Sequence, residues 1–160
     1  MPRRKKKSFK RDIGVDPIYQ SGLVQKVINV VMKGGKKNVA RNIVYGALDK
    51  LAKKAGGDKD KALEYFLKAF EKVVPMVEVR PRRVGGSVYQ IPTEVRKDRA
   101  QALAIRWIIN AASARSDKNM VTRLAHELFD AHEGRGGAIK KKMDIYRMAE
   151  VNRAFSHHAW

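Results

Sequence analysis

The chain of 160 residues contains no cysteine. This absence excludes disulfide bridges and zinc sites with thiolate ligands, and it fits a reducing compartment. Acidic residues are also scarce, because 16 aspartates and glutamates stand against 35 lysines and arginines, for a formal net charge of +19. A compact domain with this imbalance repels itself unless a polyanion neutralises it, and nucleic acid and anionic membranes are the common polyanions of cells.

Long hydrophobic runs are missing as well. No apolar run of about 18 residues, the length at which a transmembrane helix becomes feasible, occurs in the sequence, and the basic residues are spread over many segments. We therefore expect a nucleic-acid partner and no membrane. The charged N-terminus has no apolar stretch behind it, which does not fit a secretory signal, so we expect a cytoplasmic protein.

Hydrophobic residues make up 44% of the chain, enough for a core, and the length suits one domain. Apolar residues recur at helical spacing in six segments. The predicted helices span about 20–33, 38–54, 59–74 and 94–114, a stretch that includes 120–129, and about 138–155. Asp58, Thr93 and Ser116 are the predicted N-caps of the third, fourth and fifth helices. Leu67 is predicted to be buried, and the fourth helix, with two apolar rows, is predicted to be the most buried.

Between the third and fourth helices the apolar period changes from that of a helix to that of a strand. Two alternating runs flank Gly85 and Gly86, a pair that suits a hairpin turn because both central positions can require positive φ. Pro81 cannot donate to a strand ladder, which places its strand at an edge. The predicted fold class is mainly α, a single six-helix domain over residues 12–160 with a protruding two-stranded β-hairpin at about 76–92.

Basic residues dominate the N-terminal arm, residues 1–11, which contains no acidic residue. Like charges at this density do not fold alone, so the arm is predicted to be disordered and to lie on phosphates, with a solubilising tail as the alternative. Arg80, Arg82 and Arg83 lie close to the glycine turn, where their guanidinium groups suit phosphate. The alternative here is a solvated hairpin whose arginines only serve solubility.

Helix faces carry further basic residues. Lys37, Arg41 and Tyr45 are four residues apart and form one row, where Tyr45 could stack on a base or have a bland role. Three lysines open the last helix, against the helix macrodipole, an arrangement that makes sense where an anion lies there. The residues predicted to contact nucleic acid are Arg3, Arg4, Lys5, Lys6, Lys7, Lys10, Arg11, Lys36, Lys37, Arg41, Arg80, Arg82, Arg83, Arg96, Arg99, Arg106, Lys140, Lys141, Lys142, Arg147 and Arg153.

The sequence gives no support for an enzyme. His126 and His132 are six residues apart, about 600° of helix, so the two imidazoles cannot share a zinc ion. We interpret His132 as a packing or capping residue. Residues 34–37, GGKK, lack the earlier glycine and the serine or threonine of a phosphate-binding loop. Because no pair of nucleophile and base can be identified, we expect no catalytic residue, no metal site and no cofactor.

The hairpin sequence VEVRPRRVGGSVYQIP, residues 77–92, resembles that of universal small-subunit ribosomal protein seven in its bacterial form. Further matches to this family lie at residues 32–37, 104–107, 123–128, 136–142 and 148–155. The resemblance therefore covers nearly the whole chain, while Ser87 and the tail 156–160 depart from the family's pattern.

The resemblance implies a six-helix structural protein of the small ribosomal subunit with a protruding hairpin. Family members bind the 3′ major domain of 16S ribosomal RNA and nucleate assembly of the subunit head. They lie near the exit tRNA site, where the hairpin and the last helix approach tRNA and messenger RNA, and small-subunit ribosomal proteins nine and eleven are the implied neighbours. Two alternatives stay open, a DNA-architectural protein that bends duplex with a β-arm and a free RNA chaperone or translational regulator.

Overall fold

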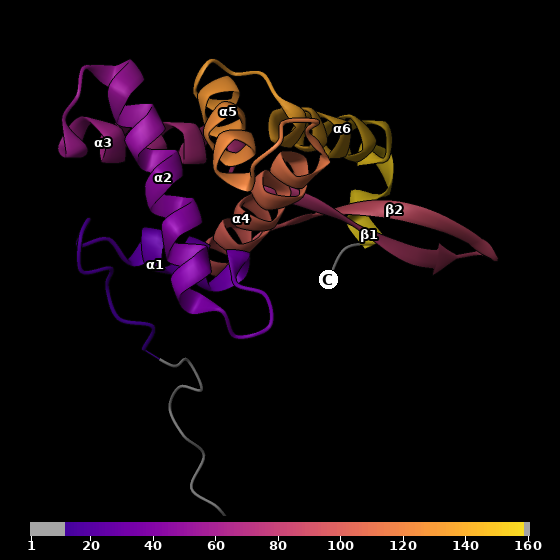
Figure 1. The fold of residues 1–160 in the computed structure, drawn as a ribbon. Coiled ribbons are helices and arrows are strands. Elements are labelled where there is room, and N and C mark those ends of the chain that lie inside the picture. Colours follow the sequence, from indigo (N-terminus) through magenta and orange to yellow (C-terminus); the bar gives the residue numbers. More distant parts are fainter. Residues whose placement is uncertain (1–11, 159–160) are drawn as a thin grey trace, which may run out of the picture.

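The computed structural model describes residues 12–158, which form six α-helices, one β-hairpin and a short 3-10 helix (Figure 1). The elements are α1 (Gly22–Val31), α2 (Lys37–Ala55), α3 (Lys59–Val73), β1 (Val77–Val84), β2 (Ser87–Glu94), α4 (Lys97–Ala114), α5 (Met120–His132), α6 (Gly137–Val151) and η1 (Arg153–His158). The prediction of a mainly α fold with a hairpin between the third and fourth helices is confirmed. The arm, residues 1–11, lies outside the described residues.

The core lies between the helices and is built from their apolar faces. Its largest fully buried side chains include Ile28 of α1, Leu48 of α2 and Leu124 of α5. Fully buried alanines recur among them, so that neighbouring helices can approach closely. Gly46 allows α2 to cross α5 closely, because a Cβ atom there would lie 3.0 Å from the Val121 side chain of α5. None of the helices in the described part of the chain is long and apolar enough to cross a membrane.

Several predicted helix boundaries need correction. Thr93 does not cap α4, because β2 continues through Glu94 and pairs Thr93 with Glu78, so that α4 begins only at Lys97. Ser116 does not cap α5, which begins four residues later, after Asn119. Both residues have cap propensity, but Thr93 lies in a strand and Ser116 lies in the loop between α4 and α5.

Three further details, two in α3 and one near the C-terminus, differ from the prediction. Asp58 occupies the predicted N-cap position of α3, but its carboxylate pairs with Lys61 at 3.3 Å and makes no capping hydrogen bond. Leu67 is 37% exposed, whereas Ala69 of the same helix is fully buried. The last helix does not run to Phe155, because α6 ends at Val151 and the chain continues as η1.

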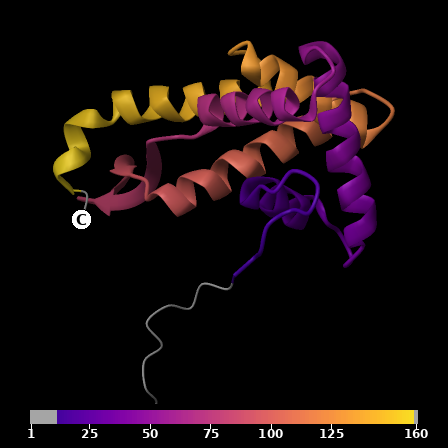
Figure 2. The same cartoon turned by 90° about the vertical axis from the view of Figure 1, so that its left-hand side faces the viewer.

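The hairpin turns at Gly85 and Gly86, whose φ angles of 57° and 93° confirm the predicted turn. Its register pairs Val77 with Glu94 at the base and Val84 with Ser87 at the tip. Figure 1 shows the hairpin projecting from the helices on the side away from α3, and Figure 2 shows α6 running above it while η1 folds down onto it. The base of the hairpin is fixed in the core by Ile91, which is fully buried.

Candidate nucleic-acid interface

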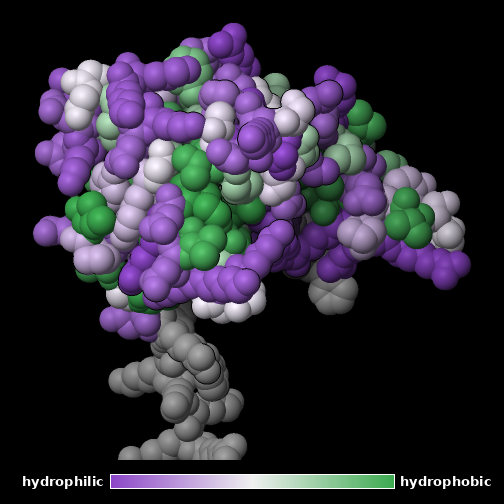
Figure 3. All heavy atoms as spheres, in the orientation of Figure 1, coloured by the Kyte–Doolittle hydropathy of each residue, from purple (hydrophilic) through white to green (hydrophobic). Residues whose placement is uncertain are grey.

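Most of the basic side chains that the sequence assigns to nucleic acid are at the surface. The exposed ones are Lys36, Lys37, Arg80, Arg83, Arg96, Arg99, Arg106, Lys140, Lys141, Arg147 and Arg153. Arg41, Arg82 and Lys142 are half-buried. The seven basic residues of the arm fall outside the described residues. The surface shown in Figure 3 is largely hydrophilic, with an apolar area near its centre.

The three hairpin arginines do not form one cluster. In an extended strand, side chains alternate between the two faces, so Arg80 and Arg82 share one face and Arg83 lies on the other. Arg80 instead joins a residue from another element, because Arg80 and Arg99 of α4 both bind the carboxylate of Glu78. The Nε and Nη2 atoms of Arg80 lie 2.8 and 2.7 Å from Glu78 Oε1, and Arg99 Nε lies 2.7 Å from Glu78 Oε2.

Glu78 is a buried carboxylate that the sequence analysis did not single out. Only 7% of the residue is exposed, although it belongs to the polar row of β1. Burial alone would raise the pKa of Glu78, but the hydrogen bonds and charges of Arg99 and Arg80 outweigh burial and lower the pKa below its ordinary value. Glu78 therefore stays ionised and connects the base of the hairpin to α4.

Tyr45 of α2 is half-buried and packs against the segment that precedes α1. Its hydroxyl donates to Asp16 Oδ1 at 2.5 Å, and its ring lies against Tyr19 with centroids 6.0 Å apart. Burial first, and then the hydrogen bond to Asp16, raise the pKa of Tyr45 to about 12. Of the two roles considered for Tyr45, stacking on a base and a structural role, the structure supports the structural one, because Tyr45 anchors the segment before α1. Arg41, in the same row, has a buried Nε with no hydrogen-bond partner in the described part of the chain.

The lysines at the start of α6 have different surroundings. Lys140 and Lys141 are exposed, whereas Lys142 donates to the carbonyl oxygen of Lys72 at 2.7 Å and caps the end of α3. Burial lowers the pKa of Lys142. Lys142 thus holds two helices together in the protein itself.

The start of α6 has a carboxylate of its own chain. Glu127, 1% exposed, accepts a hydrogen bond from the backbone N–H of Ala138 at 2.8 Å and one from Arg115 Nε at 2.8 Å. Arg115 also contacts Asp130. The start of α6 therefore has an internal anion, whose charge is balanced directly by Arg115. Sequence reasoning missed it because Glu127 and Ala138 lie in different helices.

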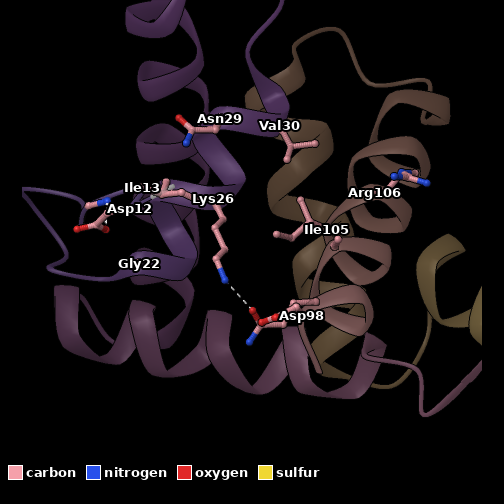
Figure 4. A pocket seen from close by; sticks show the side chains of 12 residues that line it. Asp12, Ile13, Gly22, Lys26, Asn29, Val30, Asp98, Ile105 and Arg106 are labelled. Carbon is pink, nitrogen blue, oxygen red and sulfur yellow. Dashed lines mark hydrogen bonds between the residues drawn. The ribbon is translucent and has the colours of Figure 1, made fainter. Parts of the chain in front are cut away.

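A groove of about 810 Å³ lies between α1 and α4 (Figure 4). Val30 and Ile105 contribute apolar walls, and Lys26 Nζ reaches across from α1 to donate to Gln101 Oε1 at 2.8 Å. Arg106, one of the predicted contact residues, stands at its edge. The groove could not be found from sequence, because its two walls are about 75 residues apart, the separation of Lys26 and Gln101.

Two histidines, His126 and His132, make structural contacts. His126 Nδ1 lies 3.1 Å from Asp117 Oδ2, and the ring of His132 stacks on Tyr65 with centroids 3.6 Å apart. Burial first, and then the charge of Lys72, lower the pKa of His132. His132 is thus the packing residue that the sequence predicts. Within residues 12–158 there is no group of three or more metal-ligating side chains.

Comparison with known proteins finds relatives over nearly the whole chain. A model of the family described as ribosomal protein S7p/S5e matches residues 2–153. The small ribosomal subunit protein uS7 of Chromohalobacter salexigens is 54% identical over 158 residues, which cover 99% of this chain and 99% of that protein. The uS7 protein of Nautilia profundicola is 52% identical over 157 residues, which cover 98% of this chain and 99% of that protein.

Proposed function

This chain belongs to the ribosomal protein S7p/S5e family, and from that premise we propose that it binds the 3′ major domain of 16S ribosomal RNA and nucleates assembly of the head of the small subunit. The coarser role follows from the family itself. The chain is a structural constituent of the small ribosomal subunit, where it binds ribosomal RNA, and it is not an enzyme. In bacteria this particle lies in the cytoplasm.

The observation that carries the proposal is that three elements packed through α6 each carry an exposed basic side chain. Arg106 of α4, Lys141 of α6 and Arg83 of the hairpin are far apart in sequence, yet α6 packs against both α4 and the hairpin. All three side chains are exposed. Phosphate contacts of this kind supply most of the affinity for nucleic acid, and their arrangement on a rigid body sets its orientation.

The hairpin suits a second contact beyond the RNA anchor. We infer that the hairpin and the C-terminal elements lie near the exit tRNA site and messenger RNA, with ribosomal proteins nine and eleven as neighbours. The resemblance of residues 77–92 to the family supports this placement. Exposed apolar side chains on the hairpin and α6 support a protein neighbour as well, because Val88 of β2 and Val151 of α6 are 64% and 76% exposed.

Binding to matched nucleic acids tests the proposed RNA partner. The full chain would be titrated into a transcript of the 3′ major domain, a transcript of the 5′ domain of equal length and a DNA duplex, all at the same high salt concentration. We expect clear preference for the 3′ major domain, because salt removes much of the binding that charge alone provides. Equal affinity for the three would contradict the proposal, and preference for the duplex would favour a DNA-architectural protein.

A co-sedimentation experiment distinguishes a protein that assembles into the small subunit from a free RNA-binding regulator. We expect the chain to sediment with small subunits and their assembly intermediates in a sucrose gradient. Recovery of the protein only in fractions lighter than the subunit would favour a free regulator.

A further inference from the structure

The carboxylate of Glu78 occupies an unusual position for an acidic residue in so basic a protein. Its side chain is 10% exposed, and it lies at the base of the hairpin, opposite Thr93. A buried carboxylate is retained only where partners compensate its lost hydration. Here two arginines do so, Arg80 from the same strand and Arg99 from the first turn of α4.

The two arginines are more than the carboxylate requires. Two guanidinium groups around one carboxylate leave a local charge of one positive unit. The side chains of Arg80 and Arg99 are 57% and 53% exposed, so this charge faces solvent rather than the core. Each arginine has five N–H donors. Arg99 uses Nε for Glu78, and within residues 12–158 its two terminal nitrogens remain as donors for another acceptor.

We propose that Glu78 is a positioning residue that holds Arg80 and Arg99 together as one two-pronged site for a backbone phosphate of the bound RNA. The inference rests on the proposed function, because the phosphate belongs to ribosomal RNA. Planar guanidinium groups match the geometry of phosphate oxygens. The first turn of α4 lies beside the site, and the positive end of a helix also favours an anion.

Fixing the arginines before binding is what Glu78 contributes. An arginine side chain that is free in solution loses rotamer freedom when it binds, and a side chain that is already held loses less. Glu78 also joins the hairpin to α4, so it sets the spacing of the two arginines that would contact the RNA backbone. A simple clamp between strand and helix needs only one arginine, whereas the second makes the site positive.

Neutralising the carboxylate of Glu78 should change the affinity for RNA in opposite directions, depending on whether Glu78 acts only through net charge or positions the two arginines. Removing a negative charge from a protein that binds a polyanion should strengthen binding if only net charge matters. We expect Glu78→Gln to weaken binding to the 3′ major domain transcript instead, by about fivefold, because the arginine pair is no longer held. The magnitude of the salt slope should fall by about one, as it does when one phosphate contact is lost.

The matched control is Glu94→Gln, on the same hairpin and exposed. We expect this variant to bind the transcript as tightly as the wild type, or slightly more tightly. If Glu78→Gln binds as tightly as Glu94→Gln, with an unchanged salt slope, the proposal is overturned and Glu78 is only a clamp. Wild-type binding in the same titration tests the proposed function separately, since loss of that signal would concern the RNA partner and not Glu78.

A second pair of variants covers the case in which Glu78→Gln does not fold. Arg99→Lys keeps the charge but loses the planar fork, and Arg135→Lys makes the same change in the loop between α5 and α6, away from the site. Circular dichroism and the thermal midpoint establish folding of both. We expect Arg99→Lys to bind the transcript about fivefold more weakly and Arg135→Lys to match the wild type. Equal affinity of both variants would overturn the two-pronged site.

Discussion

The ring of Tyr89 in β2 stacks on the ring of Phe155 in η1, with centroids 4.2 Å apart and an interplanar angle of 30°. The contact ties the hairpin to the C-terminal part of the chain, above the base that Ile91 and Glu78 already fix. A two-stranded hairpin is marginally stable alone and needs such support. The hairpin therefore contacts the rest of the protein at two positions along its length, at its base and, nearer the turn, through the aromatic pair.

Removing this aromatic pair should loosen the outer part of the hairpin only. Aromatic pairs contribute about 0.5–1.5 kcal/mol beyond the area that they bury. For Phe155→Leu we expect an unchanged helical circular-dichroism signal and faster hydrogen exchange at the amides of β2. Phe155→Tyr keeps the ring and should exchange like the wild type. Unchanged exchange in the leucine variant would show that the hairpin does not depend on η1.

The affinity for RNA should fall steeply with salt. Neutralising on the order of eight phosphates implies that log K falls with log salt at a slope of roughly −6 to −7. The exposed basic residues of α4, α6 and the hairpin, together with the charge of +19, motivate this expectation. Filter binding at several salt concentrations measures the slope, and a value shallower than about −2 would mean that the basic surface is not the binding surface.

Deleting the arm, residues 1–11, should weaken RNA binding and leave the folding midpoint nearly unchanged. The arm has seven basic residues, and Met1 and Phe9 are the apolar side chains that it could bury. Thermal unfolding of the free protein and titration of the 3′ major domain transcript give the two quantities. A large fall of the midpoint would show that the arm packs on the body.

The anchor between Asp16 and Tyr45 makes a prediction for stability. Tyr45→Phe leaves a fully buried carboxylate with one hydrogen bond fewer, so we expect the free energy of unfolding to fall by about 1–2 kcal/mol. Urea unfolding near neutral pH measures the loss. Asp16 still accepts hydrogen bonds from the backbone N–H groups of Ile18 and Tyr19, so a complete loss of folding is not expected.

The same pair predicts a dependence on alkaline pH. The pKa of Tyr45 is raised to about 12 in the folded protein, above the ordinary value of 10.0 in the unfolded chain. A raised pKa contributes stability fully below pH 10, and this contribution is lost as the pH rises through about 12. The difference in stability between wild type and Tyr45→Phe should therefore narrow between these two pH values. A constant difference would contradict the hydrogen bond.

Local patterns in the sequence were sufficient to predict the helices and the hairpin, because each depends on neighbours within a few residues. The glycine pair at the hairpin tip is an example, and Gly56, which follows the last residue of α2, has the left-handed conformation that is common for glycine at this position. The predicted N-cap of α4 was wrong because β2 continues beyond the residues that show its apolar alternation. Threonine is common both in strands and at helix N-caps, so the residue type at position 93 could not distinguish the two.

The residue types of the candidate site could be predicted from the sequence, but the hydrogen bonds and ion pairs between its residues could not. Exposed basic residues could be chosen by type, and eleven of the assigned ones in residues 12–158 are indeed exposed. Their partners come from other elements, so no local spacing shows them. Glu78 and Arg99 are 21 residues apart and Lys142 and Lys72 are 70 apart. Such contacts decide which basic side chains hold the protein together and which face a ligand.

This distinction changes the best test of the hairpin. Arg80 is bound to a buried carboxylate, so its removal would disturb the hairpin base as well as any RNA contact. Arg82 and Arg83 lie nearer the turn, on opposite faces of the strand. The double variant Arg82→Ala/Arg83→Ala leaves the pairing of Glu78 intact. We expect its helical circular-dichroism signal to match that of the wild type.

In cells, the double variant should separate anchoring from events at the exit tRNA site. The basic residues of α4 and α6 remain, so occupancy of the protein in purified small subunits should stay close to that of the wild type. Retention of tRNA should fall, because charge-assisted contacts worth about 1.5–3 kcal/mol each in favourable settings are lost from the hairpin. Quantifying protein and tRNA in the same subunits measures both. Collapse of occupancy with a folded free protein would make the hairpin a primary RNA anchor, and no change in either quantity would leave its arginines with a role in solubility only.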